Sequence, residues 1–250
     1  MMDVMPRVAR ATPTDVTFDV ATRQVPFLQV LTPQQRERLR PVAVIHLLDP
    51  AGTVWALDEP AHDFSFVVRG HVKLLRRRED GRDVILDIRG PGDLLCAGAV
   101  AAAAPYCCAA QAIGKDVVSL SLPRQEVQEI LDECAPAAAM FFRHATTHEM
   151  RLTDRIVELA SGQVEQRIAA LLLRLADQLG LPGVRRDIRI PVKLSRQDLA
   201  DLCGTTLESA IRTMTTFARV KAVTTLSDGF VVSNRQYLES LARGHSRSRS

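Results

Sequence analysis

One stretch near the C-terminus constrains the fold of this chain more than any other: residues 194–214, LSRQDLADLCGTTLESAIRTM. It contains two short amphipathic helical patterns in succession. Ser195 is suited to cap the first helix, and Asp198 follows three residues later, as in a capping box. Gly204 lies between the two patterns and permits the tight turn of a helix-turn-helix. The spacing therefore predicts this motif.

The second helix of the motif divides into an inner and an outer face. Thr205 or Thr206 is placed to cap it. The residues expected to pack inward are Ala210, Ile211, Met214 and Phe217. The exposed side chains at the start of such a helix enter the major groove of DNA. Here they are Thr206, Glu208, Ser209 and Arg212.

The surroundings of the motif favour a winged helix-turn-helix. The segment AVTTLSDGFVVS predicts two strands around Asp228-Gly229, a hairpin signal that would form the wing. The segment IRIPVKL predicts one more strand. An amphipathic helix precedes it and ends at Gly180 and Pro182. Its apolar residues are Val164, Ile168, Leu171, Leu172 and Leu175.

The charge distribution points to a polyanionic partner for the C-terminal part. The formal net charge is only +3 over 250 residues, which permits such a partner without requiring it. Twelve of the 32 Lys and Arg residues, however, lie between Arg185 and Arg249. This skew favours a C-terminal half that meets phosphates.

The first half of the chain has a different pattern. From about Val42 to Leu122 short apolar runs alternate with turn signals such as Asp80-Gly81 and Pro91-Gly92-Asp93. This spacing predicts an antiparallel sandwich or roll. A short capped helix is predicted from Thr32. Residues 1–25 lack sustained periodicity and are expected to be loosely packed.

A long helix is predicted between these two halves. Its apolar stripe steps by three and four residues, close to a coiled-coil seam, and predicts a dimer interface between two copies of the helix. The alternative is that the helix packs on its own sheet. The residues of the predicted seam are Phe141, Ala145, His148, Leu152, Ile156 and Leu159.

The cysteines and the N-terminus indicate a cytoplasmic protein. No CxxC pair occurs, and the adjacent Cys107-Cys108 are poorly suited to one zinc ion, so we expect small buried hydrophobes in a reducing compartment. The N-terminus has no apolar run suited to a signal peptide. The uncharged stretch 94–114 is mostly alanine and a poor membrane span. The cysteines are Cys96, Cys107, Cys108, Cys134 and Cys203.

Three motifs in this order resemble transcription regulators of the catabolite-activator/fumarate-nitrate-regulator (CRP/FNR) superfamily. They are FVVRGHVKLLRRREDGRDVILDIRGPGDLL (66–95), VEQRIAALLLRLA (164–176) and the helix-turn-helix stretch at 194–214. The resemblance implies an α+β fold: an N-terminal cyclic-nucleotide-binding-like β-roll (jelly-roll), a long dimerisation helix and a C-terminal winged helix-turn-helix. The implied segments are an extension (1–25), the roll (26–134), the helix (135–161), the DNA-binding domain (162–240) and a disordered basic tail (241–250).

The resemblance also implies a function. The expected protein is a cytoplasmic homodimer that binds a palindromic operator and contacts RNA polymerase, with no membrane partner and no predicted cofactor. Arg can donate two hydrogen bonds to guanine, and Glu can accept one from cytosine, so Glu208 and Arg212 are expected to read bases. The alternative is a solvent-exposed Glu–Arg pair. Phosphate contacts are expected from Arg196, Thr205, Thr215 and Arg219.

The effector is where the chain departs from the family. Cyclic-AMP-responsive members carry a Gly-Glu pair and, about ten residues on, an Arg-Ser pair. Here the first pair falls at Cys96-Ala97, and the second at Tyr106-Cys107 or Cys107-Cys108, none of them charged. A cyclic phosphate bound there would lack a compensating cation, so we expect no ordinary cyclic-AMP binding. The cysteines that hold the iron–sulfur cluster of oxygen-sensing members are mostly N-terminal, and no cysteine precedes Cys96 here.

One alternative is a haem- or other-ligand-dependent gas or redox sensor of the same family. Members that sense carbon monoxide through haem place a ligating Cys near the position of Cys96 and a His two residues on, where this chain has Gly98. Candidate partners for Cys96 are His46, His62 and His71. Otherwise Cys96 and the alanine run fill the roll. No Gly-rich phosphate loop or Ser/His/Asp constellation indicates an enzyme.

Overall fold

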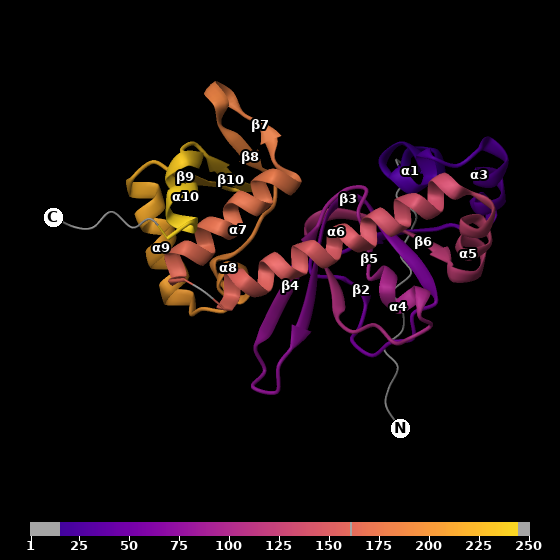
Figure 1. Cartoon of the computed structure of the whole chain (residues 1–250), viewed down its shortest axis with the longest axis horizontal. Helices are drawn as coiled ribbons and strands as arrows, with labels where there is room; N and C mark the ends of the chain where they lie inside the picture. Colours follow the sequence, from indigo (N-terminus) through magenta and orange to yellow (C-terminus); the bar gives the residue numbers. More distant parts are fainter. Residues whose placement is uncertain (1–15, 161, 245–250) are drawn as a thin grey trace. The chain divides into compact units, whose positions relative to one another are not determined.

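The computed structural model describes residues 16–160 and 162–244. The chain divides into two compact units (Figure 1). Unit 1 comprises the chain up to Leu74 together with Ile88–Thr146, and unit 2 comprises Leu75–Asp87 together with the chain from Thr147 onward. Helices and strands occur in both, as the predicted α+β class requires.

A six-stranded sheet forms where the short apolar runs predicted strands. Its main path is β1-β6-β3-β4, while β2 also pairs with β6 and β5 with β3. The first strand pairs antiparallel with the last, with Val44 opposite Ser121 and Leu48 opposite Val117. The predicted sheet domain is therefore confirmed. The strands are β1 (Val44–Leu48), β2 (Thr53–Trp55), β3 (Asp63–Arg77), β4 (Asp83–Arg89), β5 (Leu94–Leu95) and β6 (Ala109–Pro123).

Both predicted turns of this sheet are present. Gly81 adopts φ +80° between β3 and β4, and its N–H donates to the Arg78 carbonyl. Gly92 adopts φ +87° between β4 and β5. A Cβ at Gly92 would lie 2.9 Å from the Gln24 carbonyl oxygen, so this turn needs glycine for space as well as conformation.

Short helices pack beside the sheet at the start of the described chain. They are α1 (Phe18–Gln24), α2 (Pro26–Gln29), α3 (Pro33–Leu39) and the 3₁₀ turn η1 (Arg40–Val42). The capped helix predicted from Thr32 is confirmed, since Thr32 and Gln35 form a capping box.

The prediction that residues 1–25 are loosely packed is wrong for the described part, 16–25. Phe18, Ala21 and Val25 are buried, and Thr17 caps α1. The helix spans only seven residues, too few for a periodic pattern to stand out. Residues 1–15 lie outside the described part of the chain.

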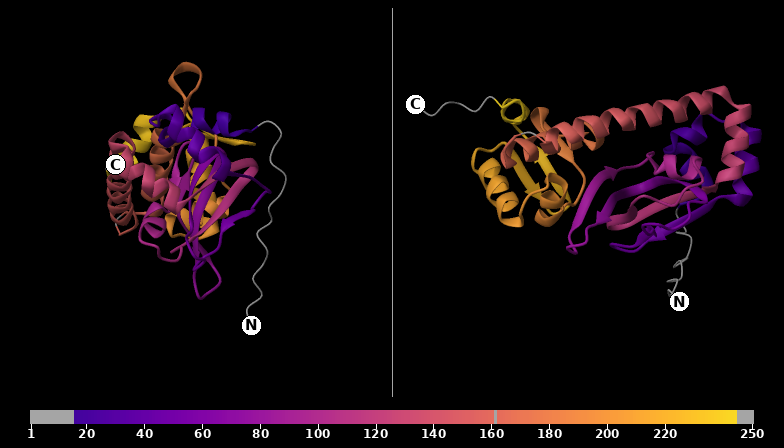
Figure 2. Two further views of the ribbon diagram at one scale, coloured as in Figure 1. Left: turned by 90° about the vertical axis from the view of Figure 1, so that its right-hand side faces the viewer. Right: turned by 60° about the horizontal axis from the view of Figure 1, so that its bottom comes forward.

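Three further helices follow: α4 (Ala97–Ala101), α5 (Arg124–Glu133) and α6 (Ala135–Ala160). Arg38 of α3 forms ion pairs with Glu126, Glu129 and Glu133 of α5. Figure 2 shows α6 as one uninterrupted helix of 26 residues, which confirms the predicted long helix.

The start of α6 packs differently from the predicted seam. The ring of Phe141 lies edge-on to Phe27 and Phe64, at centroid distances of 5.3 and 5.2 Å, and Phe27 stacks on Phe66. Phe141 therefore packs partly against unit 1 and stays half-buried, and its place in a dimer seam remains a prediction. Periodicity identifies an apolar stripe but not which neighbouring surface covers it.

The C-terminal part of unit 2 is a helix-turn-helix with a small sheet of order β7-β8-β10-β9. The predicted amphipathic helix, strand, helix-turn-helix and hairpin are all present. Helix α10 was not predicted; Asn234 caps it and Leu238 buries its inner side. The elements are α7 (Val164–Leu179), β7 (Leu181–Pro182), η2 (Val184–Arg186), β8 (Ile188–Ile190), α8 (Arg196–Cys203), α9 (Leu207–Arg219), β9 (Val223–Leu226), β10 (Gly229–Val232) and α10 (Arg235–Ala242).

The predicted tail at 241–250 therefore begins inside α10, and residues 245–250 lie outside the described part of the chain. Among the described helices, none combines the length and the apolar character needed to cross a membrane.

Candidate functional site

The turn between α8 and α9 has the predicted geometry. Ser195 and Asp198 form a capping box at the start of α8: the Ser195 Oγ accepts from the Asp198 N–H at 3.0 Å, and the Asp198 carboxylate accepts from the Ser195 N–H at 2.9 Å. Gly204 ends α8 in the left-handed region at φ +56°. The capping box and the left-handed glycine of the helix-turn-helix are therefore local features that can be recognised in the sequence.

The inner face of α9 matches the prediction at three of four positions. Ala210, Met214 and Phe217 are buried, but Ile211 is 46% exposed, and Thr213 is buried instead. Positions 210, 213, 214 and 217 follow the i, i+3, i+4, i+7 rule of one helix face, and Ile211 lies about 100° away from Ala210. Its assignment to the inner face is corrected.

Thr206 has a structural role at the start of α9. Its Oγ1 accepts from the Ser209 N–H at 3.2 Å, and its hydroxyl donates to the Ser209 Oγ at 3.0 Å. Thr206 is therefore the N-cap, one of the two candidates that the sequence offered. Both hydroxyls are engaged in the cap, so a base contact from Thr206 or Ser209 would compete with it.

The outer face of α9 presents Glu208 and Arg212. Both are exposed, and within the described residues neither side chain has an ion pair or a hydrogen bond to another residue. The alternative of a Glu–Arg surface pair is thus not formed. Both side chains can meet a partner without breaking an internal contact.

The four predicted phosphate-contacting residues differ in their engagement. Arg196 is half-buried: its Nη2 donates to Thr225 Oγ1 of β9 at 2.7 Å, its guanidinium lies 6.0 Å from the Phe230 ring centroid, and burial lowers its pKa. Thr215 is exposed but its hydroxyl donates to the Ile211 carbonyl, whereas Arg219 is exposed at the end of α9. The remaining residue, Thr205, is half-buried in the turn.

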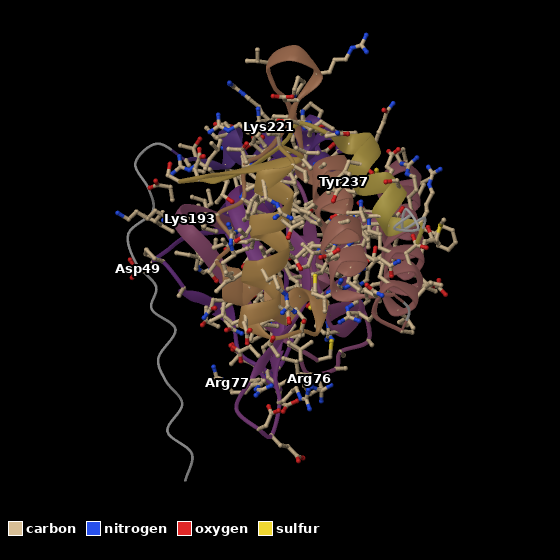
Figure 3. All side chains as sticks on the ribbon, turned by 90° about the vertical axis from the view of Figure 1, so that its left-hand side faces the viewer. Asp49, Arg76, Arg77, Lys193, Lys221 and Tyr237 are labelled. Carbon is tan, nitrogen blue, oxygen red and sulfur yellow. The ribbon has the colours of Figure 1, made fainter. Side chains whose placement is uncertain are left out.

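Two further basic residues of unit 2 lie in exposed positions. Figure 3 labels Lys193 and Lys221, which precede α8 and follow α9. The sequence analysis counted both in the basic skew but not among the DNA contacts. Their exposure beside the helix-turn-helix makes both lysines candidates for phosphate contacts.

Helix α6 carries an exposed apolar face. Of the predicted seam, Ala145, Leu152, Ile156 and Leu159 are exposed, and His148 is half-buried. Three further exposed apolar residues lie outside the predicted seam and widen the exposed apolar face: Phe142 at 73%, Met150 at 69% and Val157 at 61%.

Three thiols meet in unit 1. The Sγ atoms of Cys96, Cys107 and Cys108 all lie within 4.8 Å of one another, and those of Cys96 and Cys108 are 3.3 Å apart. The expectation that Cys107 and Cys108 are poorly suited to one zinc ion remains a prediction, although the fold brings their sulfur atoms together. Neighbouring side chains alternate in a regular strand, but the chain bends at these residues just before β6.

The protonation of these thiols reflects their packing. Contact with Cys96, together with burial, raises the pKa of the Cys108 thiol well above its ordinary range, and the nearby Arg89 acts in the opposite direction. Burial also raises the pKa of Cys107, although this residue is exposed enough to meet solvent. The other two cysteines, Cys134 and Cys203, are buried, as expected.

None of the histidines considered for haem joins this group of thiols within the described residues. His46 and His71 are half-buried and His62 is exposed. Haem at Cys96 remains a prediction.

Buried charge in the sheet is a feature that the sequence analysis missed. Arg89 and Asp87 on β4 are 2% and 7% exposed, and both interact within the chain. Their alternation in VILDIRG places them on one face of the strand, a signal that could have been read.

Comparison with known proteins covers both halves of the chain. Residues 47–134 match the family described as the cyclic nucleotide-binding domain, and residues 166–241 match the Crp-like helix-turn-helix domain. The transcriptional activatory protein AadR of Rhodopseudomonas palustris is 28% identical over 244 residues, covering 95% of this chain and 99% of that protein.

Two other comparisons agree. The CRP-like cAMP-activated global transcriptional regulator of Mycobacterium tuberculosis is 25% identical over 191 residues, covering 76% of this chain and 84% of that protein. The solved structure of FixK2 from Bradyrhizobium japonicum shares the fold, with a TM-score of 0.70 at 23% identity, covering 84% of this chain and 100% of that one. A sheet domain of the cyclic-nucleotide-binding type followed by a Crp-like helix-turn-helix makes this chain a DNA-binding transcription regulator of the CRP/FNR family.

Proposed function

We propose that the protein works as a homodimer that binds a palindromic operator, with α9 of each protomer in the major groove of one half-site. The observation that carries the proposal is the exposed and unpaired state of Glu208 and Arg212 on the second helix of the motif. Arg212 would donate to guanine O6 and N7, and Glu208 would accept from cytosine N4. A G·C-containing step in each half-site follows.

The exposed apolar face of α6 supports the dimer. Ile156 is 67% exposed and Val157 is 61% exposed. Leaving such large apolar side chains in water is unfavourable, and an exposed apolar patch of this kind marks an interaction surface. Pairing this helix with a second copy would remove them from water. A two-fold symmetric dimer requires two half-sites related by the same symmetry, and hence a palindrome.

Cyclic AMP is not the effector in this proposal. The two pairs of positions that bind the ribose and the phosphate in cyclic-AMP-responsive members correspond here to Cys96-Ala97 and to either Tyr106-Cys107 or Cys107-Cys108. The nearby cation, Arg89, already interacts within the chain. We therefore do not extend the cAMP activation of the mycobacterial relative to this chain. We further propose that the DNA-bound dimer contacts RNA polymerase in the cytoplasm.

The test is a selection from random double-stranded DNA with the full-length protein, followed by fluorescence anisotropy on the enriched site. We expect a palindromic motif, bound about 1,000-fold or more tightly than a scrambled duplex, and an affinity that falls steeply with salt. Equal affinity for the scrambled duplex, or an enriched motif without two-fold symmetry, would contradict the proposal.

A further inference from the structure

We infer that Cys96, Cys107 and Cys108 form a binding site for a thiophilic ion that takes three thiolate ligands, such as Cu(I) or As(III). The inference adds a ligand class to the sensor domain. It goes beyond DNA binding and does not depend on it.

The sulfur positions already approximate such a site. Thiolate sulfurs lie about 2.3 Å from a bound zinc ion, and three sulfurs at a similar distance from one ion are about 4 Å apart. Here the Cys96 and Cys108 Sγ atoms are 3.3 Å apart, and all three sulfurs lie within 4.8 Å of one another. Small side-chain rotations are enough to bring them around an ion.

The sheet holds two of the ligands in place from opposite ends of the loop. Cys96 directly follows β5, whose Leu95 pairs with Ser65. Its backbone lies in the left-handed region at φ +42°, which is strained for a residue with a side chain. Cys108 directly precedes β6, and its carbonyl accepts from the Trp55 Nε1–H at 2.9 Å. The strain is maintained by the pairing on either side.

An aromatic stack fixes the segment between them. The rings of Trp55 and Tyr106 stack with centroids 4.1 Å apart, and the Tyr106 hydroxyl donates to the Asp63 carbonyl at 3.1 Å. The bend at residues 107–108 therefore starts from a buried anchor. Preorganisation of this kind is what separates a metal site from a chance meeting of side chains.

The number of ligands selects the class of ion. Across the described residues, 16–160 and 162–244, no His, Asp, Glu or further Cys joins the three thiols. Structural zinc sites hold four protein ligands in a tetrahedron. Soft ions such as Cu(I) prefer thiolates and accept three of them. Cys107 is exposed and gives an ion access, while Cys108 is buried and keeps water from one side.

Binding involves no transfer of electrons. Arsenite reacts as As(OH)₃ + 3 RSH → As(SR)₃ + 3 H₂O, and Cu(I) displaces the three thiol protons into solvent. The positive charge of Arg89 near Cys108 offsets part of the negative charge that thiolates bring.

The experiment uses the reduced full-length protein under anaerobic conditions, with arsenite and Cu(I) in separate arms. After desalting, we expect one arsenic per protomer, and the five free thiols of the denatured protein should fall to two. Cu(I) should bind in competition with a chromophoric Cu(I) chelator, and Zn(II) should bind more weakly than Cu(I). Loss of only two thiols per arsenic would identify a dithiol and overturn the three-ligand site.

Two variants complete the test. Cys107→Ala removes an exposed side chain, so the fold is not at risk, and it should weaken arsenite binding about 100-fold or more, because the third ligand acts at high effective concentration. Cys134→Ala, a buried cysteine outside the group, should bind like the unmodified protein. Equal affinity of Cys107→Ala and the unmodified protein would contradict the proposal.

Discussion

Glu208 and Arg212 differ from the other polar residues at the start of α9 in having no partner within the described chain. They lie four residues apart, hence on one face, and neither is committed to a partner in the described chain. Thr206 and Ser209 are hydrogen-bonded to each other and stabilise the start of the helix instead. The residues that stabilise the start of α9 are thus distinct from the residues proposed to read DNA.

Replacing Arg212 should relax base preference, whereas replacing Arg219 should not. We expect Arg212→Ala to cost about 1–3 kcal/mol per half-site and to lose discrimination at one base pair. Arg219→Ala, on the same helix, should weaken all sequences alike because phosphates carry no sequence information. Selection from random palindromes with both variants measures this. If Arg212→Ala enriches the same motif with the same sharpness, Arg212 does not read bases.

His71 should make unit 1 sensitive to acid. Burial lowers the pKa of its imidazole from 6.5 to about 4, so the unfolded chain binds the proton first. The free energy of unfolding should therefore fall as the pH drops from about 6.5 toward 4. Denaturant unfolding followed by Trp55 fluorescence, the sole tryptophan signal of the chain, measures it. In His71→Gln the loss across this window should be smaller; an identical loss would assign it to other groups.

At the scale of elements, α6 has two kinds of apolar surface. Phe141 packs partly against unit 1, while Ile156, Val157 and Met150 remain exposed. Met150 and Val157 lie on a different side of the helix from Phe141, so the exposed apolar surface is wider than the predicted seam. The exposed part is the portion that a partner helix can cover.

The double variant Leu152→Asp/Ile156→Asp should be a monomer. Each large apolar side chain buried in a dimer contributes about 1.5–3 kcal/mol, and a carboxylate there would add repulsion between the two copies. Light scattering should show the monomer, and affinity for the operator should fall with it. Thr147→Asp, at an exposed polar position on the side of the helix away from Leu152 and Ile156, is the control for charge on the helix. If the double variant remains dimeric, this surface is not the dimer interface.

At the scale of the whole molecule, the chain combines a domain of the cyclic-nucleotide-binding type with a Crp-like helix-turn-helix domain. The first domain keeps the sheet of its family, and we propose that cysteines and alanine occupy its nucleotide-binding positions. The fold can be retained because strand pairing and core packing do not depend on the residues that contact the ligand.

Calorimetry with cyclic AMP should show no tight binding to the full-length protein. A buried phosphodiester without a compensating cation is costly, and the positions that correspond to the Gly-Glu and Arg-Ser pairs carry no cation here. A dissociation constant in the micromolar range or below would show that Arg89, or another group, takes the place of the missing arginine. Introducing Arg at Cys107 and Glu at Ala97 offers the matched gain-of-binding variant.

The sequence by itself determined the parts that depend on local chemistry. The capping box at Ser195, the left-handed Gly204 and the Asp228-Gly229 hairpin could all be predicted, because caps and tight turns follow from a few neighbouring residues. The order of the domains followed from motifs at family spacing. Helix α1 was not predicted because it spans only seven residues, with too few buried positions to form a periodic pattern.

Only the tertiary structure decided which distant surfaces meet. It placed Phe141 against Phe27 and Phe64, and it exposed Ile211. It also brought Cys96 beside Cys108 across 12 residues of chain, through the pairing of β5 and the bend before β6. Periodicity reports that a residue is apolar or polar along one helix or strand, but contacts between elements depend on how those elements pack, which no single segment encodes.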